Sequence, residues 1–565
     1  MAFDSTDKKV LARPSRRGFD RGDPRVRVFR DIIVAAVALG LLTAFSLWLR
    51  SPVADVKGVQ NEDVAGILYN ADLLLRGKVP LVDNLEYKAP GSFFLTAAVF
   101  AVFGRSVHVH ELFGIFWAIL AMLGVFAGGR VFFNSLASGI VAAFIYAGIS
   151  PIMDSMTVNY NAWMIAPYIW ATVFFGLGLK GGRLRWLVVA GIVAVVGALM
   201  KRQGAMIVPL FGLILLLGPW LRAPGTWRPP SRVRGVFAFS LGVFLGFLPI
   251  AVYYLAHGAL GAFVSQYFGS NAGWEYVQGE VNWSGKIDRL EDGVLGLFKF
   301  LVLPTMLAAM GAVSVTLRRN RGWTILGVLL GGHIFMSFVG ASLGFRFYKG
   351  YYLQLLPAMA WLGAHPEGPI LRWFNRWTWP SSGSGQVARV TQLLAVLLLC
   401  LPALLPTLSQ VKVQRRGRVL RNAYQVEIEQ ISKVIAESTK PTEGIWVWGR
   451  WAWPAYFYSN RISPTRYYKV LGLITTNLTN TWKRPTSMTR FVKKGPWRQI
   501  GADLARTRPA FIVCAKNESY HGFSALEKLL RDHYVLLREP RVNVFTFWKR
   551  KDVTIWHDGA PAIVK

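Results

Sequence analysis

The chain has 565 residues, of which 53% are hydrophobic, and its mean hydropathy is +0.35. This composition excludes an ordinary soluble domain, and the clustering of apolar residues in blocks indicates membrane spans. The formal net charge is +34. Much of that charge lies in short loops between apolar blocks, where it sets topology and contacts anionic lipid, so a nucleic-acid partner is excluded. Only two cysteines are present, which excludes a disulfide framework.

The first 409 residues are dominated by predicted membrane spans. Residues 1–30 form a basic tail, and the apolar run Ile32–Trp48 indicates an uncleaved first span. The stretch 93–103 is apolar but only about half the length needed to cross, so it predicts an interfacial or re-entrant helix. We expect about eleven spans, near residues 31–49, 109–129, 136–152, 163–179, 186–200, 204–220, 235–255, 296–316, 323–340, 351–364 and 389–408.

Loop charges predict the orientation of these spans. With a cytoplasmic N-terminus, the cytoplasmic loops collect many arginines and lysines, as the positive-inside rule requires. These residues are Arg130, Lys180, Arg183, Arg185, Arg222, Arg228, Arg232, Arg234, Arg318, Arg319, Arg321, Arg372, Arg376 and Arg389. The opposite face then receives the loops 50–108, 153–162 and 256–295 and everything after about residue 409.

The tail 410–565 has the pattern of a small α/β domain outside the membrane. An amphipathic pattern predicts a helix at 427–437, and Ser524 followed by Glu527 predicts the capped start of a helix at 524–533. Short apolar runs predict strands at 445–448, 510–514, 534–537 and 542–548. The expected organisation is therefore a cytoplasmic tail (1–30), a transmembrane domain (31–409) and an extracytoplasmic α/β domain (410–565).

The loop 50–108 carries the residues best suited to chemistry. A helix from about Asp63 to Arg76 would end at Gly77, with Asp63 in its first turn or capping it. Lys88 precedes Pro90, so the backbone there is extended. A carboxylate beside the bilayer can take a proton from an attacking hydroxyl, and an ammonium group can hold the phosphate of a lipid-linked donor. A helix cap and an interfacial anchor explain the same two residues equally well.

This loop resembles the first extracytoplasmic loop of glycosyltransferase family 39, within clan GT-C. The resemblance rests on the acidic pair Glu62-Asp63, the helix end Leu74-Leu75-Arg76-Gly77, Lys88-Ala89-Pro90-Gly91 and Phe103-Gly104. That family includes lipid A aminoarabinose transferases and protein O-mannosyltransferases. The resemblance implies that Asp63 is the catalytic base, with Glu62 as the alternative. It also implies a polytopic helical fold of GT-C type.

Other polar residues on the same face complete the predicted site. Asp154 follows a span, Lys201 and Arg202 lie at a turn where the charge rule disfavours cations, and Arg346 and Lys349 lie among tyrosines. The resemblance places a lysine at the Lys201 turn and donor-phosphate contacts near Arg346. A solvated loop at Asp154 and an aromatic belt at the tyrosines are the simpler alternatives. The predicted substrate-binding residues are Lys88, Tyr69, Tyr87, Asp154, Lys201, Arg202, Arg346 and Lys349.

Together these features predict an inverting glycosyltransferase that moves a sugar from a polyprenyl-phosphate donor to a lipid, glycan or protein acceptor of the cell envelope. The expected location is the bacterial inner membrane, and no metal site or cofactor is expected. The alternatives are transfer of an oligosaccharide from a pyrophosphate-linked lipid, a transporter of lipid-linked sugars, and a membrane scaffold. A transporter would predict inverted repeats and paired charges within spans, and neither stands out in the sequence.

Overall fold

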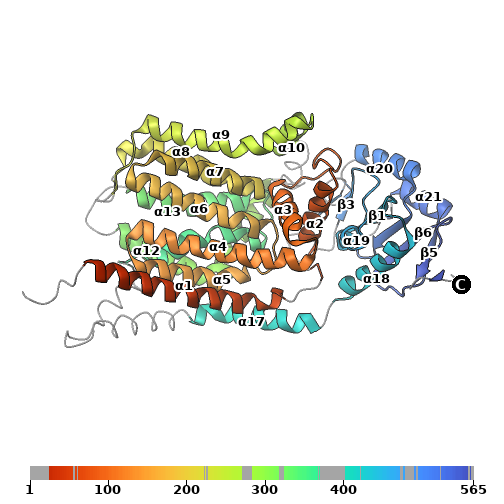
Figure 1. Cartoon of the computed structure of the whole chain (residues 1–565), viewed down its shortest axis with the longest axis horizontal. Coiled ribbons are helices and arrows are strands. Elements are labelled where there is room, and N and C mark those ends of the chain that lie inside the picture. Colours follow the sequence, from red (N-terminus) through yellow and green to blue (C-terminus); the bar gives the residue numbers. More distant parts are fainter. Residues whose placement is uncertain are drawn as a thin grey trace, which may run out of the picture.

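The computed structural model shows a helical bundle with a small sheet domain at one end (Figure 1). The structure describes residues 24–54, 58–59, 61–221, 223, 227–269, 283–316, 324–366, 368, 401–419, 422–470, 475–477, 489–491, 494–518, 520–521, 523–557 and 560–561. The predicted polytopic helical membrane fold with a C-terminal α/β domain is confirmed. The basic residues up to 23, Arg222, Arg318, Arg319, Arg321, Arg372, Arg376 and Arg389 lie outside the described residues.

Within the described ranges, seven helical segments are long and apolar enough to cross a membrane. They are α1 (Pro24–Ala54), α4 (Val107–Phe133), α6 (Tyr160–Gly181), η2 with α8 and η3 (Arg202–Met206, Ile207–Leu217 and Gly218–Trp220), α9 (Arg232–Ala256), α12 (Trp283–Thr316) and α13 (Ile325–Ser342). Shorter apolar helices are α3 (Gly91–Phe103), α5 (Leu136–Ile149) with η1 (Ser150–Ile152), and α7 (Leu184–Met200). The predicted short helix at 93–103 is α3, whose 13 residues reach only about 20 Å.

Two sequence predictions need correction in the second half of the bundle, and a third lies mostly outside the described residues. The predicted outside loop 256–295 contains α10 (Leu260–Tyr267) and the first turns of α12. The predicted span 351–364 is instead a 3₁₀ helix, η4 (Lys349–Gln354), followed by the eight-residue α14 (Leu356–Gly363), which is too short to cross. Of the predicted span 389–408, residues 389–400 lie outside the described residues, and the rest begins α17 (Leu401–Val419).

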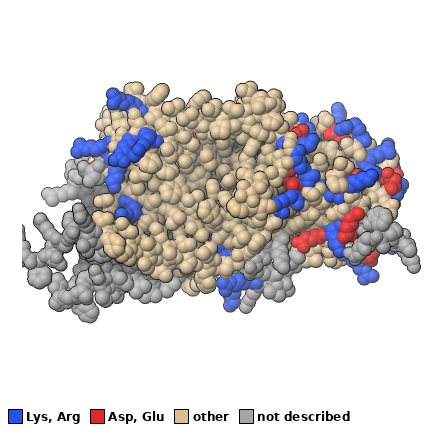
Figure 2. Space-filling model, viewed as in Figure 1, with Lys and Arg blue, Asp and Glu red and all other residues tan. Residues whose placement is uncertain are grey.

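The two ends of the bundle differ in charge and in what covers them. Lys180 Nζ donates to the carbonyl of Val131 at 3.2 Å, and Arg228 N donates to the carbonyl of Lys180 at 3.1 Å. The ends of α4 and α6 and the segment before α9 therefore meet at one end. Figure 2 shows many Lys and Arg side chains there, at the left of the view, while the C-terminal domain covers the opposite end. This segregation follows the pattern predicted from the loop charges.

The C-terminal domain is built on a four-stranded sheet of order β1-β4-β6-β5. Strand β1 (Ile445–Trp448) is parallel to β4 (Phe511–Ala515), and β6 (Phe545–Arg550) is antiparallel to β4 and β5 (Tyr534–Leu537). Helices of the domain are α18 (Ala423–Ser438), η5 (Arg450–Ala452), α19 (Pro454–Ser459), α20 (Lys494–Thr507) and α21 (Ser524–His533). The short strands β2 (Thr475–Asn477) and β3 (Thr489–Phe491), and β7 (Trp556–His557) and β8 (Ala560–Pro561), form two small pairs.

The predicted helices and strands of this domain are confirmed, with shifted details. Ser524 is the first residue of α21 rather than its cap, because Phe523 occupies the cap position without a side-chain hydrogen bond. Strand β6 begins at Phe545, three residues later than the predicted 542.

The two faces of the sheet belong to different cores. Trp446 and Ile512 pack with the buried faces of α20 and α21. Ile445 and Val513 point the other way, because side chains alternate along a strand. This second core also contains buried residues of α2 (Glu62–Leu75), which follows α1 in the chain. The sheet domain therefore rests directly on the segment that carries the predicted catalytic residues.

Candidate functional site

The N-terminus of α2 positions the acidic pair. Asn61 caps the helix, its side chain accepting a hydrogen bond from Val64 N at 2.9 Å. Asp63 is therefore a first-turn residue and not the cap, which corrects one of the two predicted placements. The rest of α2 from Val64 to Leu73 is buried, while the Asp63 side chain is 40% exposed, so a rigid helix presents an accessible carboxylate.

Lys88 reaches this carboxylate from the segment before α3. Its Nζ lies 3.4 Å from Asp63 Oδ1 and 4.8 Å from the centre of the Tyr160 ring. Its backbone N–H donates to Glu86 Oε1 at 3.0 Å. Gly91 then starts α3 so close to α7 that an added Cβ would lie 2.6 Å from the Leu199 carbonyl oxygen. Only glycine permits this approach, which brings the Lys88 segment against the bundle.

Three more predicted residues gather beside this pair. Asp154 Oδ2 accepts a hydrogen bond from Gly350 N at 3.1 Å, and Lys349 is within electrostatic reach of the same carboxylate. Lys201 donates to Asn161 Oδ1 and lies 3.8 Å from the centre of the Tyr351 ring. Lys201 also interacts electrostatically with Lys88, Asp63 and Asp154. Two carboxylates and three lysines from five separate segments therefore form one charged cluster.

Burial shifts the titration of this cluster. Desolvation raises the pKa of Asp154, against the opposing effect of Lys349. Desolvation also lowers the pKa of Lys201 well below its usual range, and the positive charge of Lys88 lowers it further. The pKa of Lys349 is lowered by burial as well, with Asp154 opposing. Such poorly hydrated cations gain strongly from an anionic ligand.

The remaining predicted residues have other surroundings. Tyr69 is buried, stacks on Tyr456 with ring centres 4.6 Å apart, and accepts a hydrogen bond from Ser463 N at 2.9 Å. It therefore packs against the C-terminal domain. Arg202 donates to the Gln266 carbonyl and lies 5.5 Å from the centre of the Tyr267 ring.

Arg346 and Tyr87 are also largely buried. Arg346 Nη1 donates to the Tyr348 hydroxyl at 3.4 Å and lies within electrostatic reach of Arg289. The Tyr87 ring has Lys469 Nζ 4.0 Å and Lys88 Nζ 5.3 Å from its centre. Tyr87 therefore lies between the predicted site and the C-terminal domain.

Glu62 is engaged by a residue that sequence reasoning missed. Its Oε1 lies 3.3 Å from Arg450 Nη1, and Arg450 Nε lies 3.3 Å from Glu518 Oε1. Desolvation raises the pKa of Glu62, with Arg450 opposing.

A second missed residue, Lys469, pairs with Glu86 in a fully buried contact. Neither cation had a signal in the sequence, because each lies hundreds of residues from its partner.

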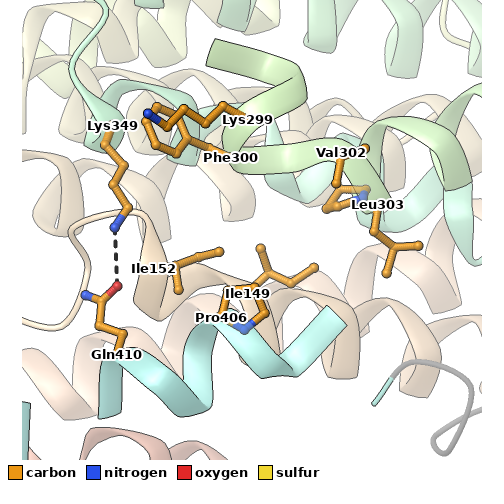
Figure 3. Close-up of a pocket in the computed structure, with 10 residues that line it drawn as sticks. Ile149, Ile152, Lys299, Phe300, Val302, Leu303, Lys349, Pro406 and Gln410 are labelled. Atoms are coloured by element: carbon orange, nitrogen blue, oxygen red, sulfur yellow. Dashed lines mark hydrogen bonds between the residues drawn. The ribbon is translucent and has the colours of Figure 1, made fainter. Parts of the chain in front are cut away.

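A cavity of about 440 Å³ opens near Lys349 (Figure 3). Its walls are mostly apolar and come from α5, η1, α12 and α17, with Lys299 and Lys349 supplying ammonium groups. Lys349 Nζ donates to Gln410 Oε1 at 3.2 Å at one end of the cavity. Helix α12 is kinked at Leu301 because Pro304 cannot donate to the carbonyl four residues earlier. The lining residues are Ile149, Ile152, Lys299, Phe300, Val302, Leu303, Pro304, Lys349, Pro406 and Gln410.

Within the described part of the chain, no group of three or more His, Cys, Asp or Glu side chains is arranged to hold a metal ion. The charged cluster instead combines one exposed carboxylate with cations from several segments. Such an arrangement can accept a proton and hold a phosphate group.

Comparison with known proteins gives the same picture. Residues 87–253 match the family model for dolichyl-phosphate-mannose-protein mannosyltransferases. No curated protein matches the sequence. The structure of ArnT from Cupriavidus metallidurans bound to undecaprenyl phosphate is similar with a TM-score of 0.52 at 14% identity, covering 93% of this chain and 98% of that one. The Archaeoglobus fulgidus oligosaccharyltransferase tethered to an acceptor peptide gives 0.53 at 12% identity, covering 94% and 76%.

The family match begins at Tyr87, so it includes Lys88, Asp154, Lys201 and Arg202, whereas Asp63 precedes it. The structural likeness extends over nearly the whole chain. The predicted resemblance to membrane glycosyltransferases of clan GT-C is therefore confirmed: the chain has their fold, with a family match across its central membrane segment.

Proposed function

We propose that this protein is an inverting glycosyltransferase that uses a polyprenyl-phosphate-linked sugar. The observation that carries the proposal is the 3.4 Å approach of Lys88 Nζ to the exposed carboxylate of Asp63, beside the cations Lys201 and Lys349. A base and a phosphate-binding group must both lie within reach of the anomeric carbon, and this cluster offers them together.

In the proposed reaction, the acceptor hydroxyl oxygen attacks the anomeric carbon while Asp63 takes its proton. The bond from that carbon to the phosphate oxygen breaks, and the polyprenyl phosphate leaves with the bonding electron pair. Lys88 holds the leaving phosphate, and Lys201 and Lys349 lie close enough to share its charge. Attack opposite the leaving group inverts the anomeric configuration. Phosphate is already ionised, so no acid is needed on the leaving side.

The cavity beside Lys349 supports a lipid-linked donor. Its apolar walls suit an isoprenoid chain, and its two lysines suit a phosphate at the membrane surface. The similar ArnT structure contains undecaprenyl phosphate. We assign Arg346 and Arg202 to the donor phosphate and Tyr87 to substrate binding, as predicted from the sequence. Tyr69 packs on Tyr456 of the C-terminal domain and so supports α2, the helix that carries Asp63.

We also propose that the site faces the extracytoplasmic side of a bacterial inner membrane, with the N-terminus in the cytoplasm. The support is the collection of Lys and Arg at the end of the bundle opposite the C-terminal domain (Figure 2). The acceptor would then be a lipid, glycan or protein of the cell envelope.

The donor can be identified by trapping it. Membranes of cells that produce the full chain with Asp63→Asn should accumulate the unused donor, which mass spectrometry of extracted lipids identifies. A sugar on a polyprenyl monophosphate supports the proposal. An oligosaccharide on a pyrophosphate would contradict it in favour of oligosaccharide transfer, and an unchanged lipid profile would count against any transferase.

A further inference from the structure

Both acidic neighbours of the proposed reacting residues are held by the C-terminal domain. Glu62 directly precedes Asp63, and Glu86 lies two residues before Lys88. Glu62 pairs with Arg450, and Glu86 pairs with Lys469. The two cations come from different parts of the domain, one after β1 and one after α19. The proposed function gave these four residues no part in the reaction.

The Glu86 contact connects Lys469 directly to the Lys88 backbone. The Glu86 side chain is fully buried and that of Lys469 is 2% exposed. Glu86 Oε1 accepts from both Lys469 Nζ and the Lys88 N–H, while Oε2 accepts from the Tyr468 hydroxyl. The Lys469 ammonium also lies 4.0 Å from the centre of the Tyr87 ring. Both carboxylate oxygens are thus engaged, and the segment carrying Lys88 has a fixed hydrogen-bond partner.

The Arg450 contact separates the roles of the two acidic residues of α2. Arg450 is itself fixed by Glu518, which accepts a hydrogen bond from its backbone N–H at 3.1 Å and forms an ion pair with its Nε at 3.3 Å. Neighbouring helix residues point about 100° apart, so Glu62 faces the C-terminal domain while Asp63 faces Lys88. Because Glu62 forms an ion pair with Arg450, Asp63 is the more accessible carboxylate of the two.

We propose, resting on the function proposed above, that Lys469 and Arg450 are positioning residues. Lys469 holds the Lys88 segment in place through Glu86, and Arg450 holds Asp63 in place through Glu62. The C-terminal domain then sets the geometry of the reaction site itself. Lys469 acts through Lys88, and Arg450 acts through the first turn of α2. Removing either cation takes away one contact of the C-terminal domain with these segments, while others remain, such as the hydrogen bond from Leu85 N to the Arg466 carbonyl at 2.7 Å.

Hydrogen exchange of the full-length chain in nanodiscs tests the positioning step without any substrate. In Lys469→Met, amides 85–89 should exchange about tenfold faster than in the wild type, because the carboxylate that binds the Lys88 N–H has lost its buried counter-ion. Lys469→Arg keeps the charge and should restore most of the protection. Lys528→Met, at an exposed lysine of α21, is the matched control. Unchanged exchange at 85–89 in Lys469→Met would overturn the proposal.

Binding of undecaprenyl phosphate to the same samples tests the consequence. Lys469→Met should weaken binding about tenfold, but should have no further effect in a Lys88→Met background, because it acts through Lys88. An equal loss in both backgrounds would show general loosening of the fold and overturn the positioning role. If the wild type does not bind undecaprenyl phosphate, the proposed donor fails, and the exchange experiment still decides whether Lys469 positions the Lys88 segment.

Discussion

Replacing Asp63 by asparagine tests the proposed catalytic role of this residue with little change to the fold. The substitution keeps the size of the side chain and its place in the first turn of α2, but removes the negative charge that faces Lys88 at 3.4 Å. Glu62 cannot easily take over, because it points about 100° away from Asp63 and pairs with Arg450. The change therefore removes one proposed base and leaves the surrounding contacts in place.

The structure allows the expected loss of stability in Asp63→Asn to be compared with the expected loss of reaction rate. The Asp63 side chain is 40% exposed, so its pair with Lys88 contributes less than about 1 kcal/mol to stability. Its interaction with the helix dipole adds a similar small amount. Loss of a general base, in contrast, slows a reaction roughly 10²- to 10⁴-fold. That slowing raises the barrier by about 3 to 5 kcal/mol, well above the cost to stability.

The assay measures release of free polyprenyl phosphate in membranes supplied with a lipid extract that contains the donor. We expect Asp63→Asn to lose at least 99% of turnover, on the order of the lower limit for a general base, while its melting temperature changes by only a few degrees. Asp532→Asn is the matched control, since Asp532 lies 3.6 Å from Arg531 and is 41% exposed. Turnover above about a tenth of the wild type, with an intact control, would refute Asp63 as the base.

Three further predictions follow from the buried pair, the cations and the cavity. Glu86→Gln should cost about 3–5 kcal/mol of stability by leaving Lys469 uncompensated, and Glu86→Gln with Lys469→Met should cost much less; equal melting temperatures for the single and double variants would contradict this. Burial lowers the pKa of Lys349, so its charge is lost at lower pH than in an ordinary lysine. Affinity for undecaprenyl phosphate should therefore fall as pH rises from about 7 to about 10, and fall less in Lys349→Arg; the same decline in both would exclude Lys349 as the titrating group. Ile152→Trp should fill the cavity and weaken that binding about tenfold, whereas Leu405→Trp, at an exposed position, should not; native mass spectrometry of lipid retention measures both.

Local signals explain which parts could be predicted from the sequence. The helix that carries Asp63 could be located because its apolar spacing and the stop at Gly77 are encoded within about fifteen residues. Gly77 indeed has a positive φ of 73°. Helix α12 begins earlier than predicted because its first turns carry Lys286, Asp288 and Arg289, which hide a helix from any hydropathy argument.

The long-range contacts could not be predicted in this way. Lys469 and Glu86 are 383 residues apart, and nothing near either residue encodes the pairing. The same holds for Arg450 and Glu62. The sequence could propose Asp63 and Lys88 as partners because both lie in one short loop. Nothing in the sequence pointed to a role for the C-terminal domain in the reaction, because Arg450 and Lys469 reach that loop only in the folded chain.

The core shared by α2 and the sheet domain has a consequence for biosynthesis. Helix α2 is synthesised well before the sheet domain whose residues help to bury it. Under the proposed function and orientation, a nascent chain would carry Asp63 and Lys88 across the membrane before the sheet domain could arrange them for use. Under the proposed function, activity would begin only when the sheet domain had folded onto α2, so an unfinished chain would leave the lipid-linked donor untouched.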